Sequence, residues 1–189
     1  MWKYRRRIFN LKKLAGFLPT PPGIIEQMLV FAEVGPKDLI YDLGCGDGRI
    51  LITAAKKFGA KGIGVDIDPK LVQEAKDNAE KEGIGCLVSF IEQDAMAINV
   101  SEATIVFLYL PASSVYKLKP KLEKELNPDT LLVSHGDSYF KNCSPFKTKI
   151  VTDSKGFIYT LYLWRVKDIK RGSRSQINNK LNKELAVSN

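Results

Sequence analysis

Three glycines and two carboxylates are crowded into the stretch YDLGCGDGR. Gly44, Gly46 and Gly48 have no Cβ, so the backbone there can turn tightly and approach a ligand closely. Asp42 comes before these glycines and Asp47 lies among them. Two negative side chains repel a pyrophosphate but suit a ligand that carries an ammonium group or another positive centre. The residue types therefore predict a loop that binds a small, partly cationic molecule.

The spacing of the glycines separates this loop from a common alternative. A dinucleotide-binding loop carries the pattern G-x-G-x-x-G and seats a pyrophosphate on the first turn of the helix that follows. Here the pattern is G-x-G-x-G, with the third glycine one position earlier. The spacing and the flanking carboxylates argue against a nicotinamide dinucleotide and favour a different cofactor.

Predicted strands and helices alternate along the central part of the chain. Five strands are indicated by apolar runs, at residues 38–44, 61–67, 86–94, 103–111 and 130–136. Helices are indicated between them by apolar residues at helical spacing, over 48–59, 68–83 and 115–126. Two more strands are predicted within 146–166, joined by a turn at 153–156.

This alternation predicts the fold. Repeats of strand and helix require parallel strands with right-handed crossovers, and a closing hairpin adds an antiparallel edge. We therefore expect an α/β fold, a Rossmann-like doubly wound sheet that is mostly parallel with a C-terminal antiparallel hairpin. Ligands of such sheets bind outside the carboxyl ends of the strands, where the strand order reverses. The glycine loop follows the first predicted strand and is expected at that point.

The length of 189 residues suits one domain with a core of its own. No apolar run reaches the ~18 residues needed to cross a membrane. The three cysteines, Cys45, Cys86 and Cys143, show no metal-binding spacing, so free thiols in a reducing, cytoplasmic compartment are expected. Neither a metal site nor a disulfide framework is predicted.

The net charge of +8 is concentrated at the two ends of the chain. Residues 1–18 hold six Lys and Arg and no acidic residue, and residues 165–189 hold seven against two. The stretch 19–164 keeps 16 basic and 19 acidic residues, a net charge of −3. We therefore expect a basic amphipathic arm, one folded central domain and a basic, polar, disordered tail, with these boundaries.

The two basic ends suggest partners that carry negative charge. RNA and an anionic membrane surface are the candidates, and a solvated extension is the alternative. An acid-free, arginine-rich arm is also typical of transit peptides, so an organellar address stays open beside the cytoplasmic one. A small compact domain with no obvious exposed apolar face indicates a monomer.

The stretch DLGCGDGR resembles motif I of the class I methyltransferases, enzymes that bind S-adenosylmethionine. In that family an acidic residue at the end of the second strand binds the ribose hydroxyls, and Asp66 stands at the matching position, with Ile67 next to it. An acidic residue after the third strand commonly meets the adenine amino group, and Asp94 stands there. Taken alone, either aspartate is more typical of a helix cap.

The resemblance is strongest to a small subgroup, the archaeal protein-lysine methyltransferases and the related mitochondrial lysine methyltransferases. It extends over about residues 19–164, through PTPPGIIEQML, YDLGCGDGRILITAAK, NVSEATIVFLYL, LKPKLEKELNPDTLLVSH and YTLYLW. The PTP segment resembles the part that folds over the cofactor, which places Thr20 and Pro21 at the site. The implied cofactor-binding residues are Thr20, Asp42, Gly44, Cys45, Gly46, Asp47, Asp66, Ile67 and Asp94.

The end of the fourth predicted strand bears on the methyl acceptor. It reads Tyr109-Leu110-Pro111. Enzymes that methylate amino groups of nucleic-acid bases show Asn or Asp there, followed by Pro-Pro and an aromatic residue. This departure argues against adenine or cytosine, and the resemblance implies a protein lysine as the acceptor.

A lysine acceptor must lose a proton before it attacks a methyl group. With a pKa near ~10.4, about one side chain in 2,500 is neutral at pH 7, a cost of roughly 4.6 kcal/mol. A partly apolar channel lowers the pKa of the ammonium, and one oxygen orients the freed lone pair. Tyr109 is the candidate for that oxygen, and an aromatic side chain that packs at the sheet edge is the alternative. His135 either faces the acceptor or, the interpretation we favour, is a structural histidine bonded to a loop.

Three functions stay open at this point. The leading one is an S-adenosylmethionine-dependent methyltransferase that modifies lysine side chains of proteins. The second is a methyltransferase of RNA or of a small molecule that uses the same cofactor. The third is a non-catalytic module that binds cofactor or docks on a membrane, which the complete motif set disfavours.

Overall fold

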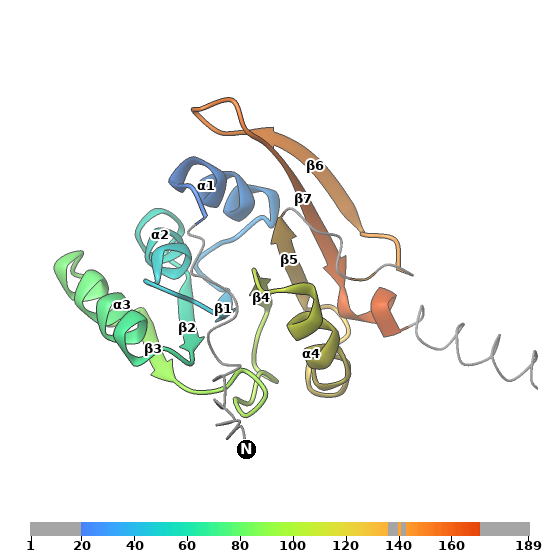
Figure 1. The fold of residues 1–189 in the computed structure, drawn as a ribbon, viewed down its shortest axis with the longest axis horizontal. Helices are drawn as coiled ribbons and strands as arrows, with labels where there is room; N and C mark the ends of the chain where they lie inside the picture. The colour runs from blue at the N-terminus through green and yellow to red at the C-terminus, as the bar shows by residue number, and fades with distance from the viewer. Residues whose placement is uncertain (1–19, 136–139, 141–142, 171–189) are drawn as a thin grey trace, which may run out of the picture.

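The computed structural model describes residues 20–135, 140 and 143–170. Its strands are β1 (Leu39–Leu43), β2 (Lys61–Asp66), β3 (Val88–Glu92), β4 (Ile105–Leu108), β5 (Leu131–His135), β6 (Lys147–Thr152) and β7 (Ile158–Arg165). Its helices are α1 (Pro22–Phe31), α2 (Arg49–Phe58), α3 (Pro69–Lys81) and α4 (Ala112–Glu125). The predicted alternation of strand and helix is confirmed (Figure 1).

The strands form one sheet in the order β3-β2-β1-β4-β5-β7-β6. Strands β1 to β5 pair in parallel, whereas β7 is antiparallel to both β5 and β6. The expected α/β, doubly wound sheet with a closing antiparallel hairpin is therefore confirmed. The order reverses between β1 and β4, so the loops that follow these two strands diverge and leave room for a ligand.

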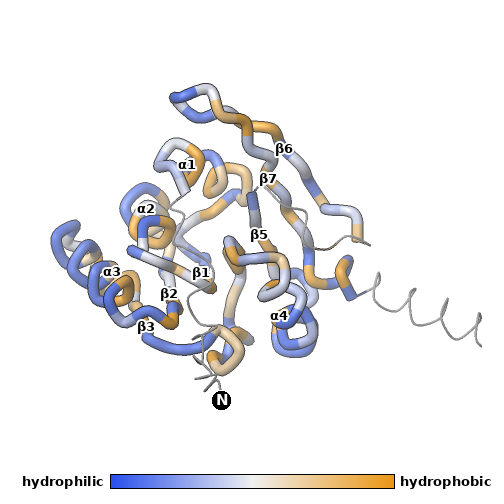
Figure 2. Tube along the Cα trace, in the orientation of Figure 1, coloured by the Kyte–Doolittle hydropathy of each residue, from blue (hydrophilic) through white to orange (hydrophobic). Residues whose placement is uncertain are grey.

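Helices cover both faces of the sheet. Residues of α1, α2 and α3 form one apolar core with the sheet, and residues of α4 form a second core on the other face. Orange, apolar stretches accordingly lie along parts of the sheet, while much of α3 and α4 is blue (Figure 2). The helices thereby hold the parallel strands, and the loops at their carboxyl ends, in fixed positions.

The segment before β1 is helical, which the sequence analysis did not predict. Pro21 is the N-cap of α1, and a proline in the first turn costs nothing because the amides there have no helical partner. Four side chains of α1 are buried: Ile24, Ile25, Met28 and Leu29. They pack α1 against α2 and β6, so the segment is part of the core.

Two predicted local signals are confirmed. Asp68 is the N-cap of α3, and its side chain accepts a hydrogen bond from the amide of Lys70 at 3.0 Å. The turn of the hairpin lies where it was predicted, since the amide of Gly156 donates to the carbonyl of Asp153 at 3.1 Å. Both features follow from residue types whose side chains or backbone favour caps and turns.

The predicted boundary between the domain and the tail at residue 165 was wrong. Arg165 is the last residue of β7, and residues 166–170 continue as a helical turn. Val166 and Ile169 in that turn are fully buried against the α4 side of the sheet. The polar character of the tail as a whole concealed these two core positions. The arm predicted over 1–18 and the tail beyond 170 lie outside the described residues.

Within the described residues, no helix has the length and apolarity that crossing a bilayer demands. The same residues hold no group of three or more His, Cys, Asp or Glu side chains arranged to bind a metal ion.

Candidate functional site

The loop between β1 and α2 has the backbone conformation that its glycines suggested. Gly44, Gly46 and Gly48 have φ angles of 91°, 54° and 79°, values at which a side chain is strained. The amides of Gly44 and Cys45 both donate to the carbonyl of Val65, at 2.8 and 3.0 Å. The loop is therefore tied to the end of β2 and lies beside the residues that follow that strand.

Asp66 completes this tie from the β2 side. Its Oδ2 accepts a hydrogen bond from the amide of Gly46, and its Oδ1 accepts one from the amide of Asp68, both at 3.0 Å. Each carboxylate oxygen can accept a further bond. Asp66 thus holds the loop in shape and keeps acceptor capacity for two hydroxyls of a bound ligand.

Asp42 is the most unusual carboxylate of the site. It is 2% exposed, and its Oδ2 has no hydrogen-bond partner among the described residues. Burial, followed by the charges of Asp66 and Asp47, raises the pKa of Asp42 to about 7. A cation beside Asp42 would stabilise its ionised form, because an opposite charge favours ionisation. The side chain therefore fits the positively charged part of a ligand.

Asp47 was expected to face a cationic ligand, but in the structure it is paired with Arg49. The guanidinium of Arg49 donates to Asp47 Oδ1 from Nε at 2.8 Å and to Oδ2 from Nη2 at 2.5 Å. Such a bidentate pair neutralises the carboxylate, so Asp47 contributes less to the attraction of a cation than Asp42 does. Asn78 supports the loop by donating to the carbonyl of Asp47 at 3.2 Å.

The segment before α1 is joined to the loop and to β5. Arg49 Nη1 donates to the carbonyl of Thr20 at 3.2 Å, and Thr20 Oγ1 lies 3.0 Å from His135 Nε2 in a hydrogen bond. Thr20 is 4% exposed and His135 is 2% exposed. The expectation that His135 is bonded to a loop is confirmed, and Thr20 is the partner.

Tyr109 follows β4 and stacks on His135. The two ring centroids are 4.0 Å apart with an interplanar angle of 24°. Tyr159 from β7 meets the same imidazole edge-on, with centroids 5.8 Å apart. Burial lowers the pKa of His135 to about 4, so the imidazole is neutral at neutral pH. The half-buried Tyr109 ring therefore packs against this imidazole, which is the alternative considered for it, and its role toward the acceptor stays a prediction.

The remaining predicted positions, Ile67, Asp94 and Cys45, show no feature in the structure that points to a ligand. Ile67 is 44% exposed at the end of β2. Asp94 is exposed, and its Oδ1 accepts from the amide of Met96 at 2.9 Å in a turn, so it does not cap a helix, which was the alternative considered. Cys45 is buried, and this burial raises the pKa of its thiol, so the thiol stays protonated. Cofactor contacts of Ile67, Asp94 and Cys45 stay predictions.

Two contributors were missed by the sequence analysis. Arg49 stands directly after the loop in the stretch DGR, a position that was read only as the start of a helix. Asn78 lies 31 residues from Asp47, so nothing in the sequence marks it as a partner of the loop. The Asn78 contact depends on how α2 and α3 pack, whereas the Arg49–Asp47 pair depends on the turn of the backbone between these two residues.

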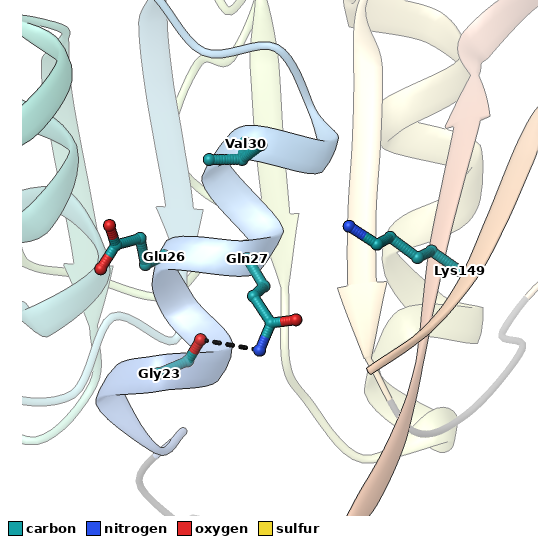
Figure 3. A pocket seen from close by; sticks show the side chains of 5 residues that line it. All are labelled: Gly23, Glu26, Gln27, Val30 and Lys149. Carbon is teal, nitrogen blue, oxygen red and sulfur yellow. Dashed lines mark hydrogen bonds between the residues drawn. The ribbon is translucent and has the colours of Figure 1, made fainter. Parts of the chain in front are cut away.

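Two hollows of the described surface lie away from this site. One, of about 310 Å³, lies between α1 and β6 and is lined by Gly23, Glu26, Gln27, Val30 and Lys149 (Figure 3). Gln27 there donates to the carbonyl of Gly23 at 3.1 Å, and Glu26 pairs with Lys57 at 2.5 Å. Glu26 and Gln27 thus already have partners, so Asp42 Oδ2, which has none among the described residues, is better evidence for a ligand site than this hollow is.

Comparison with known families decides what the site belongs to. A model of the ANTKMT methyltransferase domain matches residues 42–138, which include the glycine loop, Asp66, Asp94 and Tyr109. A protein-lysine N-methyltransferase of Saccharolobus islandicus is 40% identical over 155 residues, which are 82% of this chain and 95% of that protein. The chain belongs to this methyltransferase family.

Two further relatives place the methyltransferase among its neighbours. A lysine N-methyltransferase of Homo sapiens, named for a subunit of ATP synthase, is 30% identical over 118 residues, 62% of this chain and 50% of that protein. A crystal structure of an RNA methyltransferase from Salinibacter ruber with S-adenosyl-L-homocysteine is 42% identical, with a TM-score of 0.72 over 79% of this chain and 94% of that one. The fold is therefore that of S-adenosylmethionine-dependent methyltransferases.

The site of this methyltransferase fits its cofactor, S-adenosylmethionine. The unpartnered oxygen of Asp42 suits a positively charged group, and the loop glycines leave backbone open to close approach. A side chain at Gly44 would place its Cβ 2.6 Å from the Leu110 side chain, which follows β4. The space between the loops after β1 and β4 is thus kept clear of side chains from the β1 side.

Replacing Asp66 with alanine is expected to weaken cofactor binding by at least about 1.5 kcal/mol, roughly tenfold, because hydrogen bonds to a charged acceptor are lost. The dissociation constant of S-adenosyl-L-homocysteine, measured by calorimetry, checks this. The Asp68→Ala variant is the control, since it removes only the cap of α3. Equal affinity of Asp66→Ala and wild type would remove the ribose assignment.

Proposed function

We propose that this methyltransferase transfers methyl groups from S-adenosylmethionine to lysine side chains of proteins. The observation that carries the proposal is Tyr109 at the end of β4, held against a neutral, buried imidazole. Enzymes that act on base amino groups place Asn or Asp at this position. The relative from Saccharolobus islandicus, named a protein-lysine N-methyltransferase, supports the same acceptor.

The second candidate is methylation of RNA, because the Salinibacter ruber relative bears that name at a similar identity. RNA binding depends on phosphate contacts from clustered basic side chains. Residues 19–164 carry a net charge of −3, so the body of the domain offers little of this attraction. An RNA acceptor would have to be held mainly by the basic ends of the chain.

The residues of the site divide the work between donor and acceptor. Bound S-adenosylmethionine supplies a methyl group that is already activated on a sulfonium. Asp42 would hold the cationic end of the cofactor, Asp66 would hold the ribose and Asp94 would hold the adenine amino group. The Tyr109 hydroxyl oxygen would accept a hydrogen bond from an N–H of the neutral acceptor amine, and the lone pair of that amine nitrogen would then face the methyl group. The neutral imidazole of His135 adds no positive charge that would repel a cationic acceptor.

The experiment uses methyl-labelled S-adenosylmethionine and a cell extract, followed by separation of protein, nucleic acid and small molecules. We expect label in protein that survives acid hydrolysis as methyl-lysine. The Asp42→Asn variant is the control and should give little label at limiting cofactor. Label that nuclease releases would favour RNA, and label in small molecules would favour a low-mass acceptor. Binding without any transfer would favour a binding module.

The basic ends and the compartment belong to the same proposal. We infer a cytoplasmic, monomeric enzyme, with contact to RNA or an anionic membrane through residues 1–18 and 171–189 as the alternative role of the ends. The free thiols of Cys45, Cys86 and Cys143 suit a reducing compartment. A variant that lacks residues 1–18 should keep its affinity for S-adenosyl-L-homocysteine and lose binding to anionic vesicles or RNA, if the arm makes that contact.

A further inference from the structure

Thr20 is the point at which three distant parts of the chain meet. Its carbonyl accepts from Arg49, which in turn holds the loop carboxylate of Asp47. Its hydroxyl bonds to His135, which is 115 residues away and ends β5. Both side chains of this second bond are buried, so water does not compete for it. Thr20 therefore connects the cofactor loop to the acceptor side of the sheet.

His135 passes this connection on to Tyr109. The Nε2 bond to Thr20 limits rotation of the imidazole, and the Tyr109 ring lies flat against that imidazole at 4.0 Å between centroids. Tyr159 closes the edge of the imidazole at 5.8 Å. A phenol ring stacked on a fixed surface has its hydroxyl confined to a small region. If the imidazole turned, the preferred plane of the Tyr109 ring would turn with it.

We propose that Thr20 and His135 are positioning residues that set the direction of the Tyr109 hydroxyl. The inference rests on the proposed role of Tyr109 in orienting the acceptor amine. It goes beyond that role because it gives the segment before α1 a second task. That segment is expected to fold over the cofactor, and here it also aligns the acceptor. Alignment errors of about 1 Å can cost about a hundredfold in rate, so a modest tilt of the ring is sufficient.

The kinetic test is a double-mutant cycle. Thr20→Val keeps the shape of the side chain and removes the hydroxyl, whereas Thr20→Ser keeps the hydroxyl. We expect Thr20→Val to lower kcat about tenfold with KM for the acceptor changed less than about twofold, and Thr20→Ser to restore kcat to within about twofold. In a Tyr109→Phe background, which has no hydroxyl to direct, Thr20→Val should cause no further loss.

A substitution at His135 tests the same contact from its other side. His135→Phe keeps an aromatic surface for Tyr109 and removes the bond to Thr20. We expect it to lower kcat about as much as Thr20→Val does, and the double variant to lose no more than either single one. If His135→Phe fails to fold, the Thr20 pair still tests the proposal. The affinity of His135→Phe for S-adenosyl-L-homocysteine should change less than about twofold. The kcat of the Thr20 variants is measured at saturating S-adenosylmethionine, because Thr20 is also an expected cofactor contact.

A spectroscopic measurement separates this proposal from the choice of acceptor. His135 is the only histidine in the chain, so its imidazole nitrogen signals can be assigned without ambiguity. Thr20→Val should shift the Nε2 signal and Thr20→Ser should return it, while Tyr109→Leu should reduce the ring-current shift of the imidazole protons to the part that Tyr159 causes. These results are expected whether the labelled product is methyl-lysine or another acceptor.

Three outcomes would overturn the proposal. One is an unchanged kcat in Thr20→Val. Another is a loss in Thr20→Val that is equally large in the Tyr109→Phe background, because Thr20 would then act independently of that hydroxyl. The third is a loss of cofactor affinity that accounts for the whole effect. If the acceptor proves not to be lysine, the proposed function fails, and the same cycle run with the acceptor that is found still tests the positioning role.

Discussion

Asparagine in place of Asp42 is expected to weaken binding of S-adenosylmethionine by about 2 to 3 kcal/mol at pH 7.5, roughly 30- to 150-fold. The carboxylate is buried and its Oδ2 has no partner among the described residues, so a cationic ligand would find its charge unscreened by water. Calorimetric titration of wild type and Asp42→Asn checks the value. Asp77→Asn is the matched control, because Asp77 lies exposed on α3.

The same carboxylate predicts how cofactor affinity depends on pH. The pKa of Asp42 is raised to about 7, so the side chain is mostly protonated at pH 6 and mostly ionised at pH 7.5. Because a cation prefers the ionised form, affinity in the wild type should rise about eightfold over this interval. Asp42→Asn should show no such rise. An equal rise in both proteins would assign the titration to another group.

The free energy of unfolding of the cofactor-free protein should fall as pH rises, whereas the cofactor affinity rises. In the folded protein Asp42 keeps its proton up to about pH 7, whereas the unfolded chain releases it near the ordinary pKa of 3.8. The folded state therefore binds the extra proton, and this group lowers the free energy of unfolding as pH rises from about 4 to about 7. Without cofactor at pH 7.5, Asp42→Asn should melt above wild type. A lower melting temperature would mean that the carboxylate has a partner that stabilises its charge.

Gly48→Ala is expected to have the second large effect, a loss of about 3 kcal/mol in the free energy of unfolding. Gly48 caps α2 with a φ of 79°, where a side chain is already strained. A Cβ there would also lie 2.6 Å from Phe90 Cζ and 2.9 Å from Ala75 Cβ. Both neighbours are buried, in β3 and α3, so neither can move away without opening the core.

Gly83→Ala is the control for that experiment. Gly83 has a similar positive φ of 68°, but a Cβ added there would meet no atom within 4 Å. It should lose only the conformational part, about 1 kcal/mol. Urea unfolding of the two variants at one pH measures the difference, which isolates the steric clash. Equal losses would show that backbone strain alone explains the glycine at position 48.

Local patterns were sufficient to predict the elements that build the sheet. Apolar runs marked the strands, and Asp68 with Pro69 marked the start of α3, because capping and proline preferences act within a few residues. The glycine loop could also be predicted, because the glycines that mark it lie close together in the sequence. The location of the ligand site at this loop was predictable too, since in a doubly wound sheet the loop after β1 lies at the reversal of strand order.

The contacts that complete the site could not be predicted in this way. The Thr20–His135 bond joins residues 115 positions apart, and neither residue type is unusual where it stands. The pairing of Asp47 with Arg49 is close in sequence, but whether a loop carboxylate faces its neighbour or the ligand depends on the turn of the backbone. Val166 and Ile169 were overlooked because two apolar positions do not stand out in a polar tail.

The contact between α1 and the closing hairpin has a consequence for how the protein folds during synthesis. The apolar face of α1, which includes Ile24 and Met28, is completed by β6, more than 100 residues later in the chain. β7 in turn must enter between β5 and β6, so the sheet on this side is finished only when the last strand has left the ribosome. Contacts of such large sequence separation form slowly, and the uncovered helix face invites aggregation until they do. The nascent chain would therefore depend most on chaperones late in its synthesis, after β5 and before β7 has emerged.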